Sequence, residues 1–101
     1  MIYKLSVPMV ADDVEEFRVL EWHGAVGDHF EPGALIVELE THKAVVEVRA
    51  GQAGIFRQLF AEDGGWCQIK VPLALFSDAE DEALPEAAEG AYDLIVEFDV
   101  S

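Results

Sequence analysis

Glycine and proline interrupt this chain every few residues, and that spacing rules out long helices. Ten of these residues lie between positions 8 and 72: Pro8, Gly24, Gly27, Pro32, Gly33, Gly51, Gly54, Gly64, Gly65 and Pro72. The stretches between them are rich in β-branched and aromatic residues and predict short strands at Tyr3–Val7, Phe17–Trp22, Leu35–Glu40, Val45–Arg49, Ile55–Phe60, Cys67–Ile69 and Leu73–Phe76. Short strands at close, regular spacing predict an all-β protein, either a sandwich or a flattened barrel.

The predicted strands fall into two similar halves. The segment Gly27–Leu39 aligns with Gly64–Phe76 at a constant offset of 37 residues, so that glycine meets glycine and Leu39 meets Phe76. A sequence that repeats in this way predicts two similar sheets related by an approximate twofold axis.

The segment 35–49 predicts a β-hairpin that closes at His42 and Lys43. In this register four apolar residues share one face of the hairpin: Val37, Leu39, Val46 and Val48. Glu38 and Glu47 then share the other face, and a shift of one residue would bury them. The hairpin therefore places a lysine at its tip, with the amine in water.

The charge balance excludes several classes of partner. The 101 residues carry a formal charge of −15, from 21 acidic and six basic residues, so nucleic acid and anionic membrane surfaces would be repelled. Cys67 is the one cysteine and cannot form an internal disulfide, so we expect a reducing cytoplasmic location. His23, His29 and His42 lack the spacing of metal ligands, and no metal site is predicted.

The C-terminal quarter differs from the rest of the chain. Residues 77–101 contain nine acids and no base, and residues 78–91 have the alanine-rich, acidic composition of a linker. Residues 92–101 then form a tail in which apolar side chains alternate, which predicts one more strand. An exposed strand of this kind should pair with a sheet edge. The edge would belong either to its own body, residues 1–77, or to a second copy in a homodimer.

Residues 3–76 resemble a lipoyl domain, the swinging-arm carrier of 2-oxoacid dehydrogenase complexes, within the wider biotinyl/lipoyl-attachment family. The matching segments occur in the family's order: Val7-Pro8-Met9, Val19-Leu-Glu-Trp22, Gly27-Asp28, Pro32-Gly33, Val37-Glu-Leu-Glu-Thr41, His42-Lys43-Ala44, Val46-Glu-Val48, Gly54-Ile-Phe56 and Val71-Pro-Leu-Ala-Leu75. The resemblance implies a flattened sandwich of two four-stranded antiparallel sheets with quasi-twofold symmetry, to which the C-terminal strand is an addition. It also implies covalent attachment of lipoate to Lys43, flanked by the turn residues Glu40, Thr41, His42 and Ala44.

The implied function is carriage of acyl groups and reducing equivalents, not catalysis by this chain. The implied partners are a lipoyl-attaching enzyme, a thiamine-dependent decarboxylase, an acyltransferase and a flavoprotein dehydrogenase. In the family, the loop that corresponds to Asp12, Asp13, Glu15 and Glu16 lies near the lysine turn and helps partner choice. Two residues depart from the family's pattern: His42 replaces the usual acid before the lysine, and Lys70 replaces a common glycine.

Two other interpretations remain open. A biotin carrier of a carboxylase has the same fold and tip lysine, but it usually has methionine on both sides of that lysine, whereas here the neighbours are His42 and Ala44. An unmodified relative would keep the fold as a binding or assembly module. His42 and the added C-terminal strand keep that third interpretation open.

Overall fold

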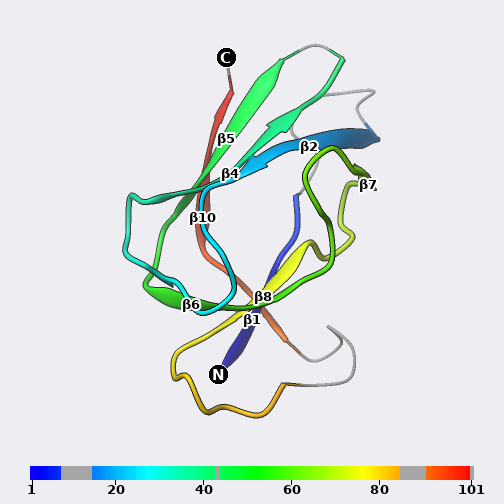
Figure 1. Ribbon diagram of the computed structural model, residues 1–101. Helices are drawn as coiled ribbons and strands as arrows, with labels where there is room; N and C mark the ends of the chain where they lie inside the picture. Colours follow the sequence, from blue (N-terminus) through cyan, green and yellow to red (C-terminus); the bar gives the residue numbers. More distant parts are fainter. Residues whose placement is uncertain (8–14, 43, 85–90, 101) are drawn as a thin grey trace.

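A computed structural model describes residues 1–7, 15–42, 44–84 and 91–100 (Figure 1). It has ten strands: β1 (Ile2–Leu5), β2 (Glu16–Trp22), β3 (His29–Phe30), β4 (Leu35–Glu40), β5 (Val45–Ala50), β6 (Gly54–Leu59), β7 (Trp66–Gln68), β8 (Ala74–Ser77), β9 (Tyr92–Asp93) and β10 (Val96–Val100). The predicted all-β class is confirmed. The described residues form no helix that could cross a membrane.

The strands form two sheets of five, in the orders β3-β6-β8-β1-β9 and β10-β5-β4-β2-β7. Without β9 and β10, each sheet has the expected four strands, so the C-terminal segment adds one strand to each. Strand β9 pairs parallel with β1, whereas β10 pairs antiparallel with β5. The expected single extra strand is therefore two strands, and both pair within the chain.

Strand order confirms the approximate twofold axis. Leaving out β9 and β10, the first sheet has the order β3-β6-β8-β1, and the second sheet read backwards has the order β7-β2-β4-β5. Each strand of one sheet therefore corresponds to the strand four places away along the eight-strand chain: β3 to β7, β6 to β2, β8 to β4 and β1 to β5. The backbone repeats as well. Within the described ranges, φ is positive at Gly27 and Gly64 (101° and 83°) and at Gly33 and Lys70 (92° and 69°), and each pair is 37 positions apart. Lys70 thus occupies a left-handed turn position whose twin is a glycine.

Replacing Lys70 by glycine is expected to stabilise the protein by about 1 kcal/mol, because glycine adopts positive φ without the steric cost that a Cβ atom brings. Urea unfolding of Lys70→Gly against the parent chain measures this. The twin position supplies the control: Gly33→Lys is expected to cost a similar amount, since no atom lies within 4 Å of an added Cβ there and only the backbone is strained. A Lys70→Gly variant less stable than the parent would show that the side chain compensates for its backbone.

The core lies between the facing sheets and is centred on aromatic rings. Phe56 and Phe76 stack with centroids 5.2 Å apart, Phe30 meets Phe76 edge-on at 5.9 Å, and Trp22 contacts Phe56 at 5.2 Å. The Trp22 indole also donates a hydrogen bond of 2.7 Å to the carbonyl oxygen of Ala61. The three phenylalanines lie on β3, β6 and β8 of one sheet and Trp22 lies on β2 of the other, so the contact between Trp22 and Phe56 joins the two sheets.

The C-terminal segment crosses from one sheet to the other at Leu94 and Ile95. Leu94 is buried, and its N–H donates to the carbonyl oxygen of Lys4 at 2.9 Å. The N–H of Gly51 donates to the carbonyl oxygen of Ile95 at 2.8 Å. A Cβ atom on Gly51 would lie 3.0 Å from that same oxygen, so the close approach requires glycine. The crossing is therefore fixed to both sheets by backbone hydrogen bonds.

The first part of the predicted acidic linker contacts the body. The Arg57 guanidinium donates to the carbonyl oxygens of Ala79 (3.0 Å) and Glu82 (2.8 Å), and the N-terminal amine of Met1 pairs with Asp78 at 3.2 Å and with Glu82. Residues 85–90 of the predicted linker lie outside the described residues. The contacts between residues 78–84 and the body hold the start of this acidic stretch beside β1 and β6.

Candidate functional site

The hairpin of β4 and β5 has the register that the sequence predicts. Leu39 pairs with Val46, Val37 pairs with Val48, and Glu38 pairs with Glu47. All four apolar members of these pairs are at most 1% exposed. Because burial of this face fixes the pairing, the hairpin holds its turn at a defined position.

Thr41 and Ala44 close the turn with three hydrogen bonds. The Thr41 N–H donates to the Ala44 carbonyl oxygen at 2.8 Å, and the Thr41 hydroxyl donates to the same oxygen at 3.2 Å. The Ala44 N–H donates to the Thr41 hydroxyl oxygen at 3.0 Å. Thr41 is only 8% exposed, so this clamp is shielded from competing water.

The predicted site residues fall around this clamp. His42 is exposed, and Glu40 pairs with the Arg18 guanidinium at 3.0 Å across the β2–β4 ladder. Lys43, the predicted attachment residue, lies outside the described residues. The structure thus describes four of the five predicted site residues, at the end of the hairpin, and both residues that flank Lys43 in the chain are among them.

A surface hollow of about 650 Å³ adjoins the turn. His42 lines it together with Glu15, Glu16, Gln68 and Ile69. Two of the four acids predicted to lie near the lysine turn, Glu15 and Glu16, are therefore beside His42. The other two, Asp12 and Asp13, lie outside the described residues. An acidic rim next to the turn would attract a basic partner.

A row of carboxylates crosses the outer face of the same sheet. Glu21 pairs with Glu38, Glu38 with Glu47, and Glu47 with Asp99, on four neighbouring strands. Like charges placed directly opposite destabilise a sheet. Arg49 offsets part of this repulsion at one end, 3.7 Å from Glu47 and 3.4 Å from Asp99. The hairpin pattern predicts only the two central members, because the others depend on strand neighbours that the sequence alone does not reveal.

His23 lies at the other end of this row. Its Nε2 atom is 2.6 Å from a Glu38 carboxylate oxygen and 4.0 Å from one of Glu21. One ligand atom from each of these three residues lies within 4.8 Å of the others, close enough to surround a small cation. No local sequence pattern brings these residues together, since Glu38 lies on a different strand from Glu21. The hydrogen bond between His23 and Glu38 by itself accounts for the arrangement.

Cys67 is half-buried on β7, next to Phe17 of β2. Burial raises the pKa of the Cys67 thiol above its ordinary value. The thiol is therefore protonated at neutral pH and is a poor nucleophile.

Comparison with known proteins identifies related sequences. The family described as "Biotin-requiring enzyme" matches residues 3–76. A dihydrolipoyllysine-residue succinyltransferase component of the 2-oxoglutarate dehydrogenase complex, from Staphylococcus saprophyticus, is 33% identical over 84 residues, which cover 83% of this chain and 20% of that protein. The pyruvate dehydrogenase complex protein X component of Saccharomyces cerevisiae mitochondria is 28% identical over 91 residues, covering 85% of this chain and 22% of that protein.

A second succinyltransferase component, from Bacillus subtilis, is 28% identical over 80 residues, covering 79% of this chain and 19% of that protein. The chain thus spans about a fifth of the length of these curated relatives. The family match at residues 3–76 includes the β4–β5 hairpin and both halves of the repeat.

Proposed function

Because the chain belongs to the biotin/lipoyl-attachment family, we propose that it is a covalent lipoyl carrier whose cofactor is joined by an amide to Lys43. The clamped β4–β5 hairpin is the observation that carries this proposal. An attaching enzyme needs an exposed lysine on a rigid, recognisable turn, and the three Thr41–Ala44 hydrogen bonds fix the chain on both sides of position 43.

The carrier works by connecting sites on other enzymes. Lipoate bound to Lys43 would supply a dithiolane that accepts an acyl group together with an electron pair and later returns to the disulfide. The protein's own residues present the arm, and the arm raises the effective concentration of the cargo at each partner. We propose a thiamine-dependent decarboxylase, an acyltransferase and a flavoprotein dehydrogenase as those partners, which makes this chain a non-catalytic component.

The acidic surface around the turn supports partner choice by charge. Glu15 and Glu16 line the hollow beside His42, and the carboxylate row lies on the same sheet as the hairpin. Partners with basic rims at their active-site entrances would associate faster with such a surface, and salt would slow them.

Lipoylation of the purified chain tests the proposal. Incubation with a lipoyl ligase, lipoate and ATP is expected to add one lipoyl group, which peptide mapping locates on Lys43. Lys43→Arg is expected to remain unmodified, because the guanidinium does not form the amide. Lys70→Arg is the matched control and should be modified like the parent.

The outcome decides between the functions considered. A chain that stays unmodified with active ligase would contradict the proposal and favour an unmodified binding module. Modification by a biotin ligase in place of the lipoyl ligase would favour a carboxylase carrier.

Replacing Thr41 by valine tests the role of the clamp. The change removes the hydroxyl but keeps the shape of the side chain, so we expect a loss of about 1 kcal/mol in stability and slower lipoylation at saturating ligase. Thr41→Ser keeps the hydroxyl and should behave like the parent in both assays. Equal ligation rates for the valine and serine variants would show that the clamp does not matter for recognition.

A further inference from the structure

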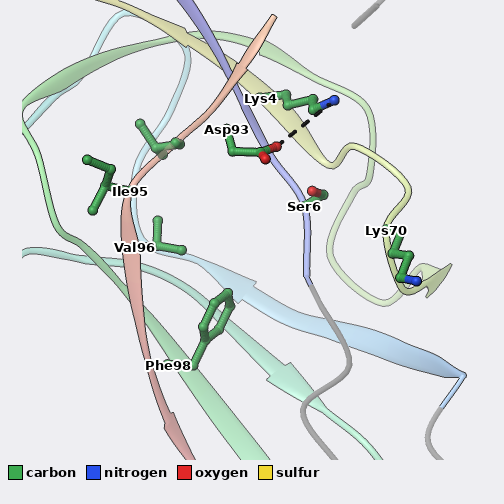
Figure 2. Close-up of a pocket in the computed structure, with 8 residues that line it drawn as sticks. Lys4, Ser6, Lys70, Asp93, Ile95, Val96 and Phe98 are labelled. Atoms are coloured by element: carbon green, nitrogen blue, oxygen red, sulfur yellow. Dashed lines mark ion pairs between the residues drawn. The ribbon is translucent and has the colours of Figure 1, made fainter.

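A second cleft, of about 500 Å³, lies on the side of the sandwich where the C-terminal segment crosses between the sheets (Figure 2). Lys4 and Ser6 approach it from β1 and the residues that follow it, and Lys70 from the turn between β7 and β8. Val96 and Phe98 line it from β10. Figure 2 shows both side chains projecting from β10 toward the side where Ser6 and Lys70 lie. The volume is in the range of small-molecule sites.

The apolar wall of this cleft is rigid. The crossing segment is held by the Leu94 N–H on the Lys4 carbonyl oxygen and by the Gly51 N–H on the Ile95 carbonyl oxygen. The side chains of Val96 and Phe98 are half-buried and pack against the core. An apolar surface that is fixed in advance costs a ligand little ordering free energy.

The charge of the cleft is opposite to that of the protein. Lys4 and Lys70 are two of only six basic residues in a chain with a formal charge of −15. Lys4 Nζ has a loose partner, Asp93, at 4.0 Å. Lys70 has no acidic group within 4.0 Å and no side-chain hydrogen bond among the residues that the structure describes. Its amine is therefore available to an anion.

Lys70 also has a strained backbone. Its φ of 69° is the one positive value at a non-glycine residue in the described ranges. Strained backbone of this kind clusters at binding and active sites, where the surrounding structure holds it in place. At its twin, Gly33, the chain has the residue that this backbone favours.

We propose that this cleft binds a small amphipathic monocarboxylate. The carboxylate would pair with the amine of Lys70, and a short alkyl chain would pack on Val96 and Phe98. Asp93 and the net negative charge disfavour a dianion such as a phosphate monoester. The site is independent of Lys43.

Titration of the ¹⁵N-labelled full chain with octanoate tests the proposal. The titration needs octanoate concentrations up to about 10 mM, because so small a ligand is expected to have a dissociation constant in the millimolar range. Saturable shifts are expected for the amides of Lys4, Lys70 and residues 94–98. Octanol, which lacks the charge, and octyl phosphate, which carries a larger one, should each bind at least about fivefold more weakly.

Matched variants separate the contributions. Lys70→Gln removes the charge but keeps a side chain on the strained backbone, and it should weaken octanoate binding about fivefold or more. Lys70→Arg should retain binding. Arg18→Gln makes the same charge change outside the cleft and should leave the affinity unchanged. Phe98→Leu keeps β10 apolar and should weaken octanoate binding. It should have less effect on the ratio between the affinities for octanoate and for octyl phosphate.

Three results would overturn the proposal: shifts that do not saturate, equal binding of octanol and octanoate, or equal losses for Lys70→Gln and Arg18→Gln. Tighter binding of octyl phosphate would reassign the head group to a phosphate. Lys43→Arg should bind octanoate like the parent, so failure of the lipoyl proposal would leave this result unchanged.

Discussion

Phe76→Ala is expected to destabilise the protein by about 3–5 kcal/mol, the range for removing a large aromatic side chain from a packed core. Phe76 is fully buried and contacts the rings of Phe30 and Phe56, so its loss leaves a cavity between the two sheets. Domains of this size have only about 5–15 kcal/mol of stability in total. A large part of the population is therefore expected to unfold in urea concentrations that the parent withstands.

Phe60→Ala provides the matched control, because the same change is made at a ring that is 44% exposed. It is expected to cost less than about 1 kcal/mol. Equal losses of unfolding free energy for the two variants would contradict the placement of Phe76 in the core and Phe60 at the surface.

Removal of residues 91–101 is expected to lower the free energy of unfolding by about 2–4 kcal/mol. The truncation removes the buried side chain of Leu94 and the half-buried side chains of Val96 and Phe98, so the core surface that they cover is exposed to water. It also leaves the edges of β1 and β5 unpaired, so the shortened chain should associate at high concentration. Urea unfolding and size-exclusion chromatography measure the two effects. A truncated chain that matches the parent in both would show that the segment contributes nothing to the fold.

Two glycine substitutions test the same docking without shortening the chain. Gly51→Ala places a Cβ atom 2.8 Å from a side-chain carbon of Ile95, which forces the crossing segment to move. Gly54→Ala has no neighbouring atom closer than 3.7 Å and should be tolerated. We expect faster amide exchange over residues 92–100 in the first variant only. Similar exchange in both would argue that the crossing is loosely held in the parent.

The features that the sequence predicts correctly are those set by local alternation. The β4–β5 register follows from the side-chain pattern, because any slip would bury Glu38 and Glu47. The two halves of the repeat follow from the matched glycines, and the structure extends the match to the left-handed backbone of Gly33 and Lys70. The sequence already marks Lys70 as a lysine in place of a common glycine, and the structure shows that its backbone has the positive φ of its twin, Gly33.

The features that the sequence does not predict depend on which strands become neighbours. The alternation in residues 92–100 predicts one strand, but the hydrogen bonds of Leu94 and Ile95 to the body divide it between two sheets. The carboxylate row needs β2, β4, β5 and β10 side by side, and no local pattern specifies that order. The two-residue strand β3 was also not predicted, since it forms only by pairing with β6.

The intact mass of the protein isolated from its native host, with peptide mapping around Lys43, tests the carrier function most directly. We predict a single lipoyl increment on the peptide that contains Lys43 and none on the peptides that contain Lys4 or Lys70. An unmodified Lys43 in cells whose other lipoyl proteins are fully modified would contradict the account.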